Sequence, residues 1–235
     1  MKKIITFLLL TCFTSILHSQ KHEIGFFLGG TNYIGDIGST NYINPNEFAG
    51  GIVYKLNLNN RIALRANLSY FVISGDDANA NNSHREERFN GLGASFENVI
   101  SELGVGIEFN FFDYQIDVPS KNFTPYIMAE VAAYNYEVLS TFSDSDRVFD
   151  NKFSVAIPVG IGIKGKLIGR VGYALETGIR FTFTDELDYT TDRFNDTIDN
   201  RFDFGGNGDD FYVFTGFSLV YSFGRPPCYA PLPLD

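Results

Sequence analysis

The sequence contains no tryptophan, and only two cysteines and three histidines occur among its 235 residues. The two cysteines and three histidines do not have the spacing of a metal site. No glycine-rich loop that could cradle a phosphate is present either, because Gly104/Gly106 and Gly160/Gly162 stand inside alternating, strand-like segments. We therefore predict neither a metal nor a cofactor.

The few histidines do not suggest a catalytic site. His18 falls in the amino-terminal leader described below, His22 follows it directly, and His84 stands beside Ser83 in a polar segment. A serine and a histidine that are neighbours in a loop lack the orienting group and rigid setting that activate a nucleophile. We predict that the protein is not an enzyme. An enzyme that acts on lipid through His84 is an alternative.

Long apolar runs are missing except at the start of the chain. Lys2 and Lys3 precede an apolar stretch from Ile4 to Leu17, and the small Ser19 follows. This pattern predicts a secretory signal peptide over residues 1–19, which is too short for a spanning helix. A lipoprotein signal that uses Cys12 is the alternative, but the apolar run continues past that cysteine.

Cations are also scarce, with 18 Lys and Arg against 28 Asp and Glu, which gives a net charge of −10. Loss of the leader with Lys2 and Lys3 brings the charge to −12. We therefore expect an exported protein that does not bind nucleic acid. Its mature chain keeps one cysteine, Cys228, and an odd cysteine in an oxidising compartment predicts an intermolecular disulfide or a free thiol.

The sequence is rich in alternation between apolar residues and small or polar ones. Residues 211–223 alternate for longer than the roughly 9–11 residues with which a tilted strand crosses a bilayer. Alternation predicts seven further strands. Their ranges are 23–29, 48–58, 61–73, 99–110, 123–138, 153–164 and 170–184. Pro158 lies inside the segment 153–164 and cannot donate a backbone hydrogen bond to a neighbouring strand, so we expect it to disturb the register there.

The connections predict how these strands are arranged. The turns at 59–60 and 165–169 are short and the turn at 111–122 is modest, whereas 30–47, 74–98, 139–152 and 185–210 are long. Short turns at one end and long loops at the other are typical of outer-membrane barrels. We predict an all-β fold: an eight-stranded antiparallel transmembrane β-barrel over residues 20–223, integral to the bacterial outer membrane and in contact with its lipid. A soluble β-sandwich is the structural rival.

The polar faces of the strands are mostly Gly and Ala with a few charges, which indicates a packed lumen. Eight strands enclose a space that side chains just fill, where unpaired charges are costly. The predicted lumen charges are Arg65, Glu102, Glu108, Glu130, Glu176 and Arg180. We interpret them as a structural plug, with a gate or proton path as the alternative. The acidic segment 185–210 could hold calcium, but it has no EF-hand spacing and is more simply a solvated loop.

After the last strand, residues 224–235 hold four of the eight prolines of the chain. Such a segment favours extended polyproline geometry and cannot continue the sheet. We predict a periplasmic tail that docks a partner, with Arg225, Cys228 and Tyr229 as contact residues. A disordered remnant is the alternative.

Several ordered stretches together resemble a known family. They are 28–38 (LGGTNYIGDIG), 54–56, 61–66, 75–77, 85–88, 95–96, 100–103, 108–112 and 221–223, with Arg225, the following prolines and Cys228. This set is similar to PorG-type outer-membrane barrels, which are associated with the type IX secretion system. The resemblance covers most of the mature chain, although 139–152 and 185–210 carry little of it.

The resemblance implies a non-enzymatic barrel that tethers a periplasmic ring of PorK-like lipoprotein and PorN-like subunits to the outer membrane. It also implies an ordered first-loop motif of Gly30, Asn32, Tyr33, Gly35 and Asp36, in which glycines allow tight turns and Asp36 caps backbone amides. Cys228 would then form a disulfide with a ring subunit or pack against it. The functional alternative is a stand-alone barrel that binds or passes a small apolar solute, or acts as an adhesin.

Overall fold

The structure is a computed structural model that describes residues 21–80, 94–116, 123–143, 146–190 and 208–224. The expected leader at 1–19 lies outside the described residues. So do Arg225, Cys228 and Tyr229 of the expected tail, and Ser83 and His84.

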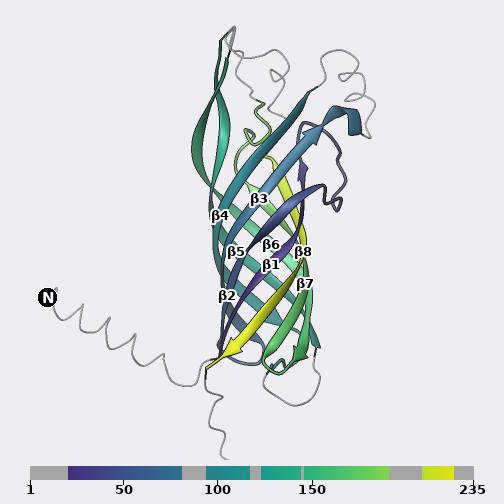
Figure 1. Ribbon diagram of the computed structural model, residues 1–235, viewed down its shortest axis with the longest axis vertical. Coiled ribbons are helices and arrows are strands. Elements are labelled where there is room, and N and C mark those ends of the chain that lie inside the picture. Colours follow the sequence, from purple (N-terminus) through teal and green to yellow (C-terminus); the bar gives the residue numbers. More distant parts are fainter. Residues whose placement is uncertain (1–20, 81–93, 117–122, 144–145, 191–207, 225–235) are drawn as a thin grey trace, which may run out of the picture.

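Eight antiparallel strands form one closed barrel in which every strand pairs with its neighbours in sequence order. The ring closes between the first and last strands, from His22 opposite Phe223 to Ile34 opposite Phe211. Figure 1 shows the tilted strands around a common axis. The strands are β1 (Lys21–Ile34), β2 (Glu47–Asn57), β3 (Ile62–Asp76), β4 (Ser95–Asn110), β5 (Phe123–Ser143), β6 (Asp146–Ile168), β7 (Val171–Thr182) and β8 (Phe211–Phe223).

The predicted fold class and all eight strands are confirmed, but one predicted loop is wrong. Residues 139–152 are not a loop, because β5 and β6 continue through them and pair from Leu139–Phe149 to Ser143–Asp146. Backbone pairing within this hairpin satisfies the amides and carbonyls of a segment whose side chains show little alternation. In Figure 1 the hairpin rises beyond the other strands.

Pro158 lies within β6 without shifting its register. It pairs with Arg180 of β7, whereas the ladder to β5 is interrupted between Ala129–Val159 and Ala132–Ala156. A proline has no amide proton for the ladder, so a local gap on one side is the expected cost. Both flanking pairs keep the same register, and the strand therefore crosses the sheet intact.

The outer wall is apolar on all eight strands. Exposed side chains include Phe26 on β1, Ile52 on β2, Leu103 on β4 and Ile161 on β6. The inward positions between them carry the buried polar and charged residues described below. Apolar-out and polar-in alternation is the pattern of a transmembrane barrel, and it excludes the soluble sandwich, which would bury its apolar face.

The two ends of the barrel differ. The short turns between β2 and β3 and between β6 and β7 lie at the end where Lys21 and Gly224 also lie (Figure 1). We call this the periplasmic end, because outer-membrane barrels place short turns there, and we call the opposite end the outer end. Among the helices of the described residues, none is long and apolar enough to cross a membrane.

Candidate functional site

The centre of the barrel holds a layered network of buried charges. At its periplasmic side, Glu108 of β4 receives two lysines: Lys55 Nζ lies 2.6 Å from Glu108 Oε2, and Lys164 Nζ donates to Glu108 Oε1. Arg65 Nη1 is 3.6 Å from the same carboxylate. All four side chains are buried, so this carboxylate and its cations neutralise one another in a medium that would penalise either sign alone.

Arg65 joins this layer to two further carboxylates. Its Nη1 and Nη2 donate to both oxygens of Glu176, at 2.6 and 2.8 Å, and its Nε lies 2.9 Å from Glu130 Oε1. Tyr126 Oη donates to Glu176 Oε2 at 2.6 Å, and Asn67 Nδ2 donates to Glu130 Oε2 at 2.7 Å. A planar guanidinium in a bidentate pair restricts the geometry more than a lysine could.

A second layer lies towards the outer end. Arg180 Nε is 3.8 Å from Glu102 Oε2, and Tyr212 Oη donates to that oxygen at 2.7 Å. The Arg180 guanidinium also stacks near Phe71 and Phe214, 4.9 and 5.4 Å from the ring centroids. The aromatic faces supply the cation with attraction that a single distant carboxylate does not.

The structure thus places all six predicted lumen charges in the interior and pairs each of them. Sequence reasoning missed other buried charges among the described residues, including Glu23, Lys55 and Lys164 in the strands. The sequence pattern does indicate the positions of the two lysines. Lys55 lies two residues after the inward-facing Val53, and Lys164 lies on the polar face of the alternating segment 153–164. Because side chains in a strand alternate between the two faces, assigning every second residue of each predicted strand to the interior identifies both lysines.

The side chains leave little room for water beside the Arg65–Glu176 pair. A void beside Lys55, Arg65 and Glu176 measures about 10 Å³. One water molecule needs roughly 10–15 Å³, so this void is too small to hold a continuous row of water molecules. The geometry fits a plug better than a gate.

The periplasmic end is closed by the segment that follows β4. Tyr114 and Ile116 turn back into the barrel and are buried, and Lys164 Nζ lies 4.5 Å above the Tyr114 ring. Asn60 in the β2–β3 turn holds this segment: its carbonyl accepts from the Tyr114 amide at 3.1 Å, and its Oδ1 accepts from Gln115 at 2.6 Å. Two periplasmic turns are thereby joined into one ordered surface.

The outer end contains a second cluster, built on Tyr33. Its hydroxyl lies 2.7 Å from Asp188 Oδ2 and also hydrogen-bonds Asp210 Oδ1, while the Asp36 amide donates to it at 3.1 Å. Burial, reinforced by the charge of Asp188, raises the pKa of Asp210 to about 9. Burial also raises the pKa of Asp188. The phenol has one proton, so a hydrogen bond to each aspartate requires that one of them carry a proton of its own.

The expected first-loop motif is only partly a loop. Gly30, Asn32 and Tyr33 belong to β1, because that strand pairs with β8 as far as Ile34, and only Gly35 and Asp36 lie beyond it. Asn32 instead holds the following loop, since its Nδ2 donates to the Asn41 carbonyl at 2.9 Å and its Oδ1 accepts from the Asn44 amide at 3.2 Å. Gly35 packs against Tyr33 and Asp210, where a Cβ would overlap both side chains.

No group of three His, Cys, Asp or Glu side chains could hold a metal ion in the part of the chain that the structure describes. Most of the acidic segment 185–210 that we weighed for calcium lies outside those residues.

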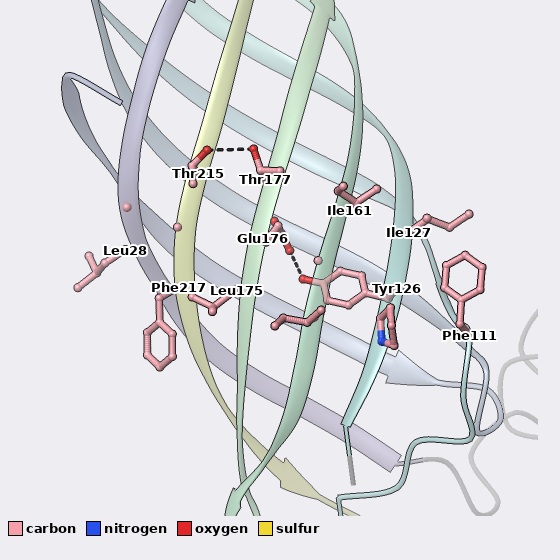
Figure 2. A pocket seen from close by; sticks show the side chains of 15 residues that line it. Leu28, Phe111, Tyr126, Ile127, Ile161, Leu175, Glu176, Thr177, Thr215 and Phe217 are labelled. Atoms are coloured by element: carbon pink, nitrogen blue, oxygen red, sulfur yellow. Dashed lines mark hydrogen bonds between the residues drawn. The ribbon is translucent and has the colours of Figure 1, made fainter. Parts of the chain in front are cut away.

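A concave surface with a volume of about 960 Å³ lies on the outer wall (Figure 2). It spans β1 and β5 to β8, and its lining includes Gly29, Gly162 and Gly216 beside exposed apolar side chains such as Leu28 and Phe217. Thr177 and Thr215 form a hydrogen bond of 2.9 Å within it. This depression faces the region where lipid chains pack against the barrel.

A family model described as a domain of unknown function, DUF6089, matches residues 2–232. The chain belongs to this family. No curated protein matches the sequence.

Among solved structures, the chain is similar to Ail, the attachment invasion locus protein of Yersinia pestis, at 8% identity and TM-score 0.48, over 87% of this chain and 99% of that one. It is also similar to the amino-terminal barrel domain of Pseudomonas aeruginosa OprF, at 11% identity and TM-score 0.45, over 87% and 98%. Neisserial surface protein A follows at 11% identity and TM-score 0.43, over 87% and 95%. These likenesses concern the fold and carry no argument about function.

Proposed function

We propose that this DUF6089 protein is a non-enzymatic barrel of the bacterial outer membrane that anchors a periplasmic assembly. On the resemblance to PorG-type proteins, that assembly is the ring of PorK-like lipoprotein and PorN-like subunits of the type IX secretion machinery. The observation that carries the proposal is the filled lumen. A barrel whose interior is occupied by paired charges is suited to acting through its surfaces rather than by passing a solute.

The periplasmic surface supports a docking role. The end of β6, next to the β6–β7 turn, exposes Leu167 and Ile168, the latter with 72% of its surface accessible. Phe112 is exposed on the segment that follows β4. The bonds to Asn60 hold Tyr114 and Gln115 of this segment in place before any partner arrives. A preorganised apolar patch binds with a smaller entropy cost than a mobile one.

The test is recovery of the intact protein from membranes without reducing agent, compared with Cys228→Ser and with Leu167→Glu/Ile168→Glu. We expect a ring lipoprotein to co-purify with the wild-type protein, and the glutamate pair to lower its recovery at least tenfold. Loss of a covalent complex in Cys228→Ser alone would assign the disulfide to the tail. A matched control, Leu103→Ala on the lipid-facing wall, should leave recovery unchanged.

Absence of any ring subunit from the wild-type sample, in cells that are exporting through the pathway, would reject the anchor. The depression in Figure 2 favours one alternative, a stand-alone barrel that binds a small apolar solute on its outer wall. Saturable binding of a fatty acid by the purified protein, lost in Thr215→Phe, would support that alternative.

A further inference from the structure

The β5–β6 hairpin extends beyond the closed part of the barrel. Pairing between β4 and β5 ends at Ser101–Asn135, and pairing between β6 and β7 ends at Ala156–Thr182. Beyond these points the two strands pair with each other as far as Ser143–Asp146. The projecting part, residues 136–143 and 146–155, is a two-stranded ribbon (Figure 1). We call it the outer ribbon.

The two edges of the outer ribbon differ. On the β5 side, Asn98 acts in place of a partner strand: its Nδ2 donates to the Glu137 carbonyl at 2.8 Å, and its Oδ1 accepts from the Glu137 amide at 3.1 Å. On the β6 side, no strand of the described chain pairs with residues 146–155. An unpaired strand edge is a template for a further strand.

The side chains along the β6 edge are exposed as well. Phe153 has 83% of its surface accessible, and Phe149, Asp150, Asn151 and Lys152 are also exposed. Lys152 Nζ pairs with Glu186 at 2.6 Å, yet close to half of its side chain remains accessible. Phe149 keeps 42% of its surface accessible, although its ring centroid lies 5.2 Å from that of Tyr189. Two phenylalanines and two opposite charges therefore flank a central asparagine on a strand edge that is unpaired within the described residues.

We propose that this edge binds a second copy of the same chain, by antiparallel pairing of β6 with β6 about a two-fold axis at Asn151. This register places Phe149 opposite Phe153 of the second copy and Asp150 opposite its Lys152, and the symmetry repeats both pairs. Aromatic and opposite-charge pairs are the cross-strand neighbours that stabilise antiparallel sheets.

Neighbouring registers are disfavoured by charge. Residues that lie opposite each other in an antiparallel pair have their side chains on the same face of the sheet. The two-fold axis between two identical strands must therefore pass through a residue that faces its own copy, and not between two residues. A shift to Asp150 would place two aspartates opposite each other, and a shift to Lys152 would place two lysines opposite each other. Like charges directly opposite are destabilising. Of these three adjacent centres, Asn151 is the one that places no like charges opposite each other.

The proposed pairing also determines how the copies are oriented. Each ribbon projects from the outer end of its own barrel. When two ribbons pair in antiparallel fashion, the two barrels therefore lie at opposite ends of the joined ribbons. Copies in one membrane point the same way, whereas copies in two apposed membranes point towards each other. The contact is therefore suited to joining two membranes, and it is independent of the periplasmic role proposed above.

A charge exchange tests the register with the full-length protein. Asp150→Lys places lysines opposite Lys152, and Lys152→Asp places aspartates opposite Asp150, so each variant alone should fail to associate. An equimolar mixture restores both opposite-charge pairs. We expect vesicles that carry wild-type protein to cluster, vesicles that carry either variant to cluster at least tenfold less, and mixed vesicles of the two variants to recover.

A cysteine at the axis gives a second measurement. In a Cys228→Ser background, Asn151→Cys brings two thiols opposite each other at about 4.5–5.5 Å between Cα atoms, which suits a disulfide. We expect an oxidised dimer, and far less of it from Leu139→Cys on the β5 strand. Folding of each variant is checked by heat-modifiable migration on gels.

The outcomes separate cleanly. Wild-type protein that neither clusters vesicles nor gives the Asn151→Cys dimer overturns the proposal. If vesicles that carry either single variant still cluster, the proposed register and partner surface are wrong. The same holds if wild-type vesicles cluster but mixed vesicles of the two variants do not.

Discussion

Arg65 and Glu176 meet across the full width of the barrel, because β3 and β7 are four places apart in the ring of eight. Arg65 Nη1 donates to Glu176 Oε2 at 2.6 Å, and Arg65 Nη2 donates to Glu176 Oε1 at 2.8 Å. A bidentate pair between opposite walls ties together two strands that share no backbone hydrogen bond. Removal of either partner should therefore affect the barrel as a whole.

Arg65→Met should be among the most destabilising single changes in the lumen. It leaves Glu130 and Glu176 buried without their main cation, and loss of one partner from a buried ion pair costs about 3–5 kcal/mol. Urea unfolding in detergent micelles, followed by gel migration, measures this loss. Glu176→Gln is the matched control, because an amide can still hydrogen-bond Arg65 and Tyr126. Equal stability of Arg65→Met and the wild type would contradict the plug.

Removing the central layer should open the barrel to ions. In the triple variant Arg65→Ala/Glu130→Ala/Glu176→Ala, the deleted side chains leave a polar space that water can fill, whereas the wild-type void holds about 10 Å³. We expect no steady conductance from wild-type protein in planar bilayers and discrete openings from the triple variant. Steady conductance by the wild type would show that the lumen is a pore.

The docking of residues 184–190 at the outer end should depend on pH. The pKa of Asp210 is about 9 in the folded protein and about 4 in an unfolded chain, so the folded state binds the additional proton. Its stabilising contribution is complete at pH values below about 4 and falls as pH rises to about 9. The negative charges of Asp188 and Asp185 favour the protonated form of Asp210, and that of Asp36 raises the pKa of Asp188.

Hydrogen exchange of the Leu187 amide, which donates to Asp210 Oδ2 at 2.9 Å, reports this docking. We expect its protection factor to fall between pH 6 and pH 9 in the wild type. Asp210→Asn removes the titration and should flatten the profile, because an amide can donate to the Tyr33 hydroxyl as a protonated carboxyl does. Parallel pH profiles in the two proteins would contradict the shared proton.

Gly35→Ala should disrupt the same cluster by steric overlap. The added Cβ would meet the Tyr33 hydroxyl and Asp210, both of which are held in place. Overpacking of this kind costs about 1–3 kcal/mol. We expect loss of Leu187 protection at every pH, with the barrel itself still folded on gels. Unchanged protection would mean that the cluster adapts to the methyl group.

The sequence by itself determined the number of strands and which side chains face inward. Alternation has a period of two residues, so the interior positions of Arg65 and Glu108 could be predicted without any knowledge of their partners. The outer ribbon was not predicted, because residues 139–152 show little alternation between apolar and polar side chains. They form strands because the ends of β5 and β6 pair with each other.

Only the tertiary structure decided which side chains meet. Tyr33 lies 155 residues before Asp188 and 177 before Asp210, and its place in a strand rather than a loop follows from pairing with β8. Closure, tilt and register of the barrel bring such residues together, and these are properties of the whole ring. The alternation of a single strand therefore predicts the face of a residue but not its neighbour across the lumen.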